Sequence, residues 1–171
     1  MANLKKFYRS KTFRFYTLRL LVTVVILLLY MMLWRPARIL VTEQLVYPQV
    51  KLLESPQSTY QSALEGGAIA VHYVHGGSAK ELHYRPQFGF FMLVALVPMI
   101  FITAHPKPYW LLGGIHLAGS LLAYLCLIIG AMGVPAGFIL VDAINGYLVP
   151  GLSLAMVPLV INGMIIKKKE D

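Results

Sequence analysis

Long apolar runs constrain what this chain can fold into more than any other feature of its sequence. The first run extends from Thr17 to Trp34, and further runs cover residues 88–104, 111–131 and 134–166. A helix that crosses a bilayer needs about 20 mainly apolar residues. The sequence therefore predicts an integral membrane protein of the all-α class.

Composition supports this prediction. The chain is 58% hydrophobic and 13% charged, whereas a soluble domain is roughly half apolar and a quarter charged. Its mean hydropathy is +0.68. The formal net charge of +8 is concentrated near the chain ends, beside apolar runs. That placement is typical of membrane topology signals and of contacts with anionic lipid headgroups, so we expect no nucleic-acid partner.

Four membrane-spanning helices are predicted, at residues 17–34, 88–104, 111–131 and 147–166. The first follows a basic segment, 1–16, and no signal-peptidase site follows it, so we expect an uncleaved anchor. The prolines of "HPKPYW" (105–110) predict a turn before the third span. The last apolar stretch is too long for one crossing and is interrupted by "DAINGY". Residues 134–145 are therefore assigned to an interfacial or re-entrant segment.

Lysine and arginine predict the orientation, because they accumulate on the cytoplasmic side of a membrane. Six lie in residues 1–19 and three in the tail 167–171, whereas the polar region 35–87 carries five, nearly balanced by four glutamates. Both termini are predicted to be cytoplasmic, with anionic headgroups as their lipid partners. Region 35–87 then forms an extracytoplasmic loop of a bacterial inner membrane protein, with an organellar membrane as the alternative.

The extracytoplasmic loop contains an alternating stretch, 68–85 ("AIAVHYVHGGSAKELHYR"), that is typical of a β-hairpin. We expect a turn centred on residues 77–78. Period-two alternation then produces one apolar face, made of Val71, Tyr73, Leu82 and Tyr84. The hairpin is predicted to lay this face on the rest of the protein.

The opposite face of the hairpin carries His72, His83 and Glu81, with the two histidines paired across the strands. Two imidazoles and a carboxylate form the ligand set of many zinc enzymes. However, Arg85 on the same face would repel a cation, and the pattern is also typical of an amphipathic hairpin with half-solvated histidines. We therefore predict no metal or other cofactor and keep a zinc site as the alternative.

Cys126 is the single cysteine and suggests a second catalytic alternative. The predicted topology places it near the outer membrane face, on the side that also holds His83 and Arg85. A Cys–Arg–His set there could attack peptide bonds of translocated substrates. The apolar surroundings "YLCLIIG" instead favour an inert thiol, because burial disfavours the thiolate.

Small and polar residues recur at helical spacing along the third span. One stripe contains Gly113, His116, Ser120 and Gly130. Such stripes let helices approach closely in a membrane, so we predict a packing face with His116 as a buried hydrogen-bonding group. Asp142 and Asn145 are expected either to end the interfacial segment or to bond to a partner helix.

The architecture resembles that of the small membrane proteins associated with exosortases. The shared features are a basic N-terminus, a single span, an extracytoplasmic segment that ends in a hairpin like 68–85, and three closely spaced spans. The resemblance implies an accessory role at an envelope-processing or export complex. Exosortases themselves carry Cys, Arg and His in that chain order, whereas here His83 and Arg85 precede Cys126. This chain is therefore not expected to be the peptidase.

These observations predict a non-catalytic accessory subunit of a larger membrane protein complex. It would dock on other membrane subunits through its small-residue helix faces and its extracytoplasmic loop. The alternative is an outer-face thiol or zinc peptidase. A third possibility, a small transporter or channel, is disfavoured because ionisable residues that line such pathways are nearly absent from the predicted spans.

Overall fold

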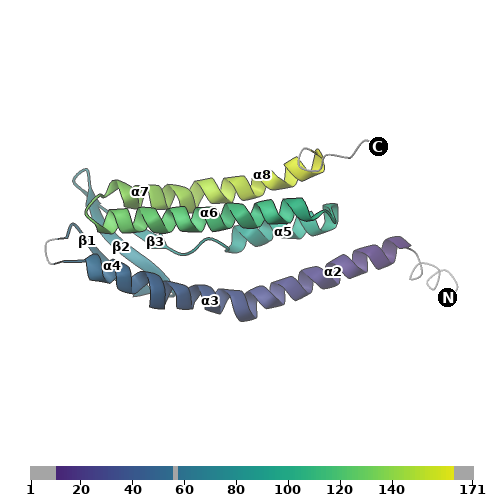
Figure 1. The fold of residues 1–171 in the computed structure, drawn as a ribbon, viewed down its shortest axis with the longest axis horizontal. Helices are drawn as coiled ribbons and strands as arrows, with labels where there is room; N and C mark the ends of the chain where they lie inside the picture. The colour runs from purple at the N-terminus through teal and green to yellow at the C-terminus, as the bar shows by residue number, and fades with distance from the viewer. Residues whose placement is uncertain (1–10, 56–57, 164–171) are drawn as a thin grey trace.

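The structure is a computed structural model that describes residues 11–55 and 58–163. Within these residues the chain is mostly helical and has one small β-sheet (Figure 1). Three helices are long and apolar enough to cross a membrane: Thr12–Leu53, Pro106–Ala131 and Ala136–Ile161. A fourth apolar helix, Phe90–Ile102, is shorter. These features fit an integral membrane protein.

The first long helix is continuous and longer than predicted. Its segments are α2 (Lys11–Leu29), η1 (Tyr30–Trp34), α3 (Arg35–Leu40), η2 (Val41–Val46) and α4 (Tyr47–Leu53). Its 42 residues from Thr12 are about 63 Å long at 1.5 Å per residue, roughly twice the thickness of a bilayer core. Residues 35–53, which the prediction placed at the start of the loop 35–87, continue this helix. Residues 1–10 of the predicted basic segment lie outside the described residues.

Short π-helical segments carry the helices through prolines that would otherwise interrupt them. Segment η1 ends two residues before Pro36, η2 two residues before Pro48, and η3 (Ile144–Leu148) two residues before Pro150. A proline ring lacks the N–H donor and clashes with the carbonyl four residues earlier. In each case that carbonyl belongs to the π segment, whose wider turn moves it away from the ring.

The C-terminal apolar stretch forms one helix, made of α7 (Ala136–Ala143), η3 and α8 (Val149–Ile161). The predicted division into an interfacial segment 134–145 and a span 147–166 is therefore wrong. Asn145 and Gly146, which suggested an interruption, lie inside the π segment. Residues 164–166 of the predicted span and the tail 167–171 lie outside the described residues.

Helix α5 (Phe90–Ile102) has 13 residues and is about 20 Å long, which is shorter than the predicted span 88–104. Helix α6 (Pro106–Ala131) begins five residues earlier than predicted. Pro106 and Pro108 lie in its first turn, where a missing N–H removes no helical hydrogen bond. The His105 side chain caps this turn by accepting from the Lys107 N–H at 3.4 Å.

The sheet is an antiparallel meander of three strands, β1 (Tyr60–Glu65), β2 (Ala68–His75) and β3 (Ser78–Tyr84). Its two turns are Gly66-Gly67 and Gly76-Gly77, and all four glycines have φ between 55° and 77°. Type I′ turns require positive φ at both central residues, which glycine adopts without strain. The sequence prediction did not include β1.

The register of β2 and β3 differs from the predicted one by two residues. His72 pairs with Glu81 rather than with His83, because the turn lies at 76–77 instead of 77–78. A shift of two residues leaves every side chain on its predicted face. The predicted apolar residues Val71, Tyr73, Leu82 and Tyr84 are accordingly all buried.

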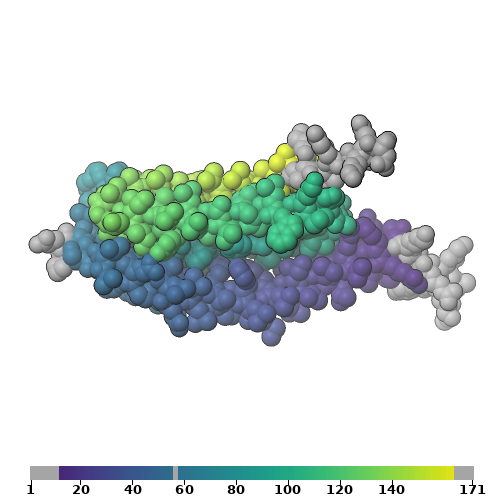
Figure 2. All heavy atoms as spheres, viewed as in Figure 1, coloured from purple at the N-terminus to yellow at the C-terminus, as the bar shows by residue number. Residues whose placement is uncertain are grey.

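The sheet covers one half of the helical layer (Figure 1). Its apolar face shares a buried cluster with α4, α6 and α7 that includes Val50, Tyr84, Leu127 and Phe138. The other half is held by a second cluster of α5, α6 and α8 around Leu112. The first helix runs along one side of the molecule past both halves (Figure 2).

Candidate functional site

A polar layer lies between the two hydrophobic clusters, where residues 85–89 connect β3 to α5. The Gln87 N–H donates to Ser120 Oγ at 2.9 Å, and the Phe88 N–H donates to His116 Nδ1 at 3.2 Å. Buried backbone donors need partners, and this connection belongs to no helix or strand that would supply them. Two side chains of α6 therefore fix its path.

His116 is 1% exposed, and both of its ring nitrogens are bonded. Because Nδ1 accepts from Phe88, the network assigns the proton to Nε2, which lies 2.9 Å from Ser153 Oγ. The Ser153 hydroxyl in turn donates to the Val149 carbonyl at 2.6 Å. A neutral imidazole has one donor and one acceptor, and both are used here within the chain.

Asn145 belongs to the same polar layer. Its Oδ1 accepts from Gln87 Nε2, and Arg38 reaches the connection from the first helix by donating to the Phe88 carbonyl at 3.2 Å. Asp142 is exposed on a helix that continues past it. The prediction that Asp142 and Asn145 could end a helix is therefore wrong.

The small-residue stripe of α6 is largely occupied by the chain's own C-terminal helix. A Cβ added at Gly130 would lie within 3.0 Å of the Phe138 ring, and one added at Gly137 would meet the backbone of Cys126 and Gly130 within the same distance. By contrast, nothing lies within 4 Å of a Cβ at Gly113. The close approach expected of such a stripe is thus made inside this molecule, and Gly113 stays open.

The structure does not bring the three candidates for a thiol peptidase together. Cys126 is 7% exposed and lines an apolar groove between α6 and the C-terminal helix. His83 and Arg85 line a separate hollow that they share with His116 and Asn145.

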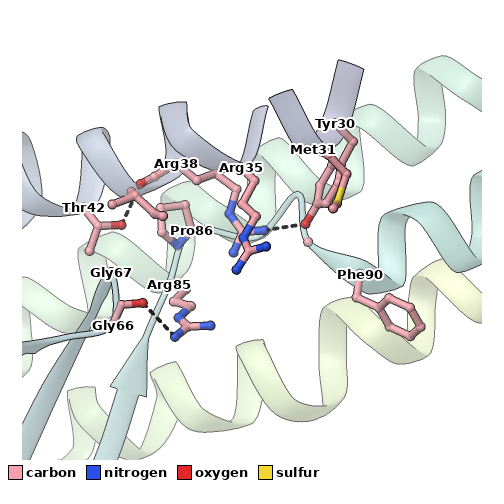
Figure 3. Close-up of a pocket in the computed structure, with 12 residues that line it drawn as sticks. Tyr30, Met31, Arg35, Arg38, Thr42, Gly66, Gly67, Arg85, Pro86 and Phe90 are labelled. Atoms are coloured by element: carbon pink, nitrogen blue, oxygen red, sulfur yellow. Dashed lines mark hydrogen bonds between the residues drawn. The ribbon is translucent and has the colours of Figure 1, made fainter. Parts of the chain in front are cut away.

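A further pocket, of about 370 Å³, is separate from the apolar groove and is lined by three arginines (Figure 3). Arg35 and Arg38 come from one face of α3, since residues three apart on a helix are neighbours, and Arg85 follows β3. Of these three arginines, only Arg85 is a candidate from the sequence. Arg35 and Arg38 were placed in a loop, and their spacing becomes informative only once that region is recognised as helical.

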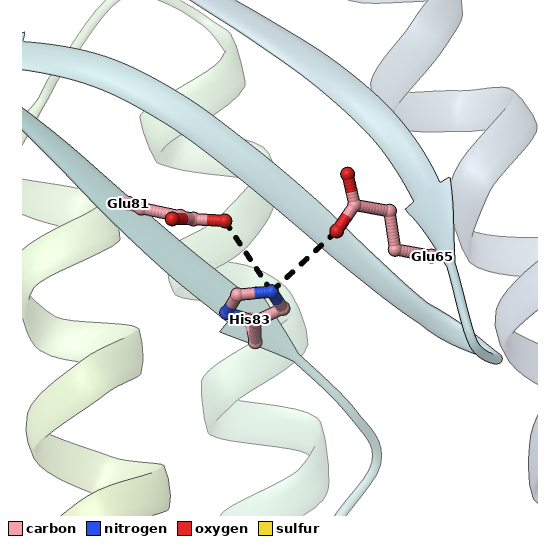
Figure 4. A group of neighbouring side chains, drawn as sticks. All are labelled: Glu65, Glu81 and His83. Atoms are coloured by element: carbon pink, nitrogen blue, oxygen red, sulfur yellow. Dashed lines mark ion pairs between the residues drawn. The ribbon is translucent and has the colours of Figure 1, made fainter.

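The polar face of the sheet carries an exposed cluster of Glu65, Glu81 and His83 (Figure 4), whose possible ligand atoms lie within 4.8 Å of one another. His83 Nε2 is 3.4 Å from Glu81 Oε1 and 3.8 Å from Glu65 Oε2. His72 Nε2 lies 3.9 Å from the same Glu81 oxygen. Imidazole and carboxylate groups are zinc ligands, but half-exposed ion pairs of this kind are also ordinary surface features. Glu65 was missed because β1 was missed.

The chain matches no protein-family model, no curated protein and no solved structure. Its description as a membrane protein therefore depends on its own fold. The described residues form three helices able to cross a membrane and a three-stranded sheet at one end of the molecule.

Proposed function

We propose that this protein is a non-catalytic subunit of a larger membrane protein complex. The observation that carries the proposal is that two surfaces on opposite sides of the same part of the molecule require different surroundings. One is a polar sheet face, and the other is an apolar helix face on the opposite side of the same helices.

The apolar surface lies on the outward side of the helices that support the sheet. Its exposed members include Leu122, Leu125, Ile129, Leu140 and Leu148. These residues lie along the same turns of α6, α7 and η3 that contribute Leu127, Phe138 and Ile144 to the cluster under the sheet. A groove of about 720 Å³, lined almost wholly by apolar residues, runs along this surface.

The polar surface is the outer face of the sheet. His72, Glu81 and His83 are all exposed there, and Gln61 pairs with His72 on the same face. Within the described part of the chain, β1 and β3 each pair with β2 alone, so each leaves one edge without a strand partner.

Neither lipid alone nor water alone is a favourable environment for both surfaces. If lipid surrounds this level of the molecule, charged side chains and open strand edges meet hydrocarbon, which membrane proteins avoid. If water surrounds it, a broad apolar helix face is left exposed, which marks an interaction site. A second protein that covers one of the two surfaces removes the conflict, and it makes this chain part of an assembly.

The polar groups in the interior support a non-catalytic role. His116, Ser120 and Asn145 are bonded within the chain, and Cys126 lies apart from His83 and Arg85. The architectural resemblance to exosortase-associated proteins makes an envelope-processing enzyme the partner that we propose first.

The topology that we propose has four crossings, by α2, α5, α6 and the α7–α8 helix, with both termini cytoplasmic in a bacterial inner membrane. The start of α2 and the end of α8 lie at the end of the molecule opposite the sheet, which supports this arrangement (Figure 1). In a Cys126→Ser background, Ser78→Cys should react with an impermeant maleimide in intact cells. Ala104→Cys should react only after permeabilisation, and the reverse pattern would exclude this orientation.

Photocrosslinking in native membranes tests the subunit proposal. A photoreactive residue is placed at Leu125 on the apolar face or at Gln61 on the polar face, since both are exposed. We expect at least one of the two positions to give a discrete adduct with another protein, because one of the two surfaces must be covered.

The matched control is the same residue at Leu112, which has no exposed surface and should give no intermolecular adduct. If Leu125 and Gln61 both give only lipid adducts or none, the conflict between the surfaces is resolved without a partner and the proposal fails.

A further inference from the structure

We propose that the arginine pocket, between the first helix and the β3–α5 connection, binds the phosphate group of an anionic lipid. Arg35, Arg38 and Arg85 line one part of the pocket, and Met31 and Phe90 line another (Figure 3). The proposal concerns a site of this chain itself and does not depend on the identity of a partner protein.

No carboxylate of the described residues forms a salt bridge with any of the three cations. No aspartate or glutamate lines the pocket, and among residues 11–55 and 58–163 the salt bridges involve only Lys51, His72 and His83 as cations. Arg35 and Arg85 are near enough to Arg38 to repel it. Like charges gathered in this way repel one another, so an anion that enters the pocket gains a favourable interaction with all three.

Two of the three guanidinium groups, those of Arg38 and Arg85, are held by hydrogen bonds, and both keep donors available. Arg38 Nη1 donates to the Tyr30 hydroxyl and to the Phe88 carbonyl, both at 3.2 Å. Arg38 Nε is buried and has no partner within the described part of the chain. Arg85 Nη2 donates to the Gly66 carbonyl at 3.2 Å. Each arginine has five N–H donors, and the planar fork matches two phosphate oxygens at once.

The surroundings of the pocket favour a lipid as the source of the phosphate. Arg35 directly follows the apolar run that ends at Trp34, so the pocket lies where a span meets the headgroup region. Trp34 and Phe88 pack edge to face with ring centroids 5.3 Å apart, and tryptophan is enriched at membrane–water interfaces. Met31 and Phe90 are 58% and 70% exposed and can contact the glycerol and acyl portion while the arginines hold the headgroup.

The test uses the full chain, purified in detergent, delipidated and titrated with phosphatidylglycerol under native mass spectrometry. We expect one tightly bound lipid per chain. Arg35→Gln and Arg85→Gln should each weaken binding about tenfold or more, because each removes charge-assisted hydrogen bonds. The Arg35 side chain is exposed and makes no hydrogen bond to the other described residues, so its variant should keep the wild-type fold and melting temperature.

The charge-matched control is Lys80→Gln, which removes one cation from the exposed end of the sheet. Unchanged affinity in both arginine variants, or an equal loss in Lys80→Gln, would overturn the proposal. Inorganic phosphate is then added as a competitor to identify the source. Displacement of the lipid by phosphate, with phosphate binding lost in Arg35→Gln, supports a site for free phosphate. Lipid binding that phosphate does not displace supports a lipid site.

Discussion

At the scale of single residues, His116 determines how the two halves of the molecule are joined. Its ring connects the Phe88 backbone, which leads into α5, with Ser153 on α8. An ionisable residue inside a membrane segment is a functional candidate by default. Here its hydrogen bonds are all made within the chain, so its role is to hold three elements together.

Replacing His116 by alanine should destabilise the fold. The change leaves the Phe88 N–H and one side of the Ser153 hydroxyl without partners and opens a cavity, and we expect the unfolding free energy to fall by about 2–4 kcal/mol. Tryptophan fluorescence during unfolding in mixed micelles measures this quantity. His75→Ala, at an exposed position of β2, is the control, and an equally small effect of both changes would contradict the role given to His116.

Glu54 ties the end of the first helix to the sheet. Its carboxylate accepts from the Ser62 N–H at 3.0 Å, from the Ser62 hydroxyl at 2.5 Å and from Lys51 Nζ at 2.9 Å. Partial burial acts to raise the pKa of Glu54, but the hydrogen bonds from Ser62 and Lys51 outweigh it, so the pKa lies below its ordinary value. The carboxylate form is therefore the one that stabilises the sheet.

This shift predicts the sign of a pH effect. Because the folded-state pKa is lowered, the stabilisation is fully present above the unfolded-state value of about 4.3 and is lost as the pH falls through the folded-state pKa. The protection factors of the β1 amides against hydrogen exchange, which are corrected for the intrinsic pH dependence of exchange, should fall over that acidic range in the wild-type protein. The fall should be smaller in Glu54→Gln, and an identical pH profile of protection for both proteins would exclude Glu54 as its cause.

At the scale of elements, the sequence predicted which residues are apolar and which faces they occupy, but not where the helices end. The faces of β2 and β3 follow from strict alternation, which a two-residue error in register does not change. The continuation through Pro36, Pro48 and Pro150 could not be predicted, because a proline favours a kink or an interruption and the sequence does not mark the π turns that accommodate these three. β1 was missed since "YQSALE" carries only a weak alternation.

The candidate sites could be predicted where they depend on local sequence signals, but not where they depend on contacts between distant segments. The stripe on α6 was predicted from a local signal, small residues at helical spacing, and in the structure His116 and Gly130 contact other parts of the chain. Glu65 joins the carboxylate cluster, and Arg35 joins the arginine pocket, only through elements that the prediction lacked. Residues brought together by long-range packing have no signature in a single sequence.

The contact between α6 and α7 allows a sharp test at this scale. A Cβ at Gly137 would press on backbone atoms of Cys126 and Gly130, which cannot rotate away, so Gly137→Ala should lower the unfolding free energy by about 2–3 kcal/mol. A Cβ at Gly114 meets nothing within 4 Å. Gly114→Ala should therefore be neutral or stabilise by up to about 1 kcal/mol. Equal melting temperatures for the two variants would contradict this packing.

At the scale of the whole molecule, the polar face of the sheet and the apolar face of the helices under it require different environments. The sheet packs on helices whose opposite side exposes leucines and isoleucine. The first helix adds to the unpaired apolar area, since only 6% of its most apolar window is buried. Much of the molecule is thus built to contact lipid or another chain rather than itself.

The most direct test is to extract the protein from native membranes in mild detergent, then determine its size and its companions by chromatography and mass spectrometry. The account predicts a defined complex in which the 19.1 kDa chain travels with at least one other membrane protein at fixed stoichiometry. A monomer, or an assembly of this chain alone, would contradict it.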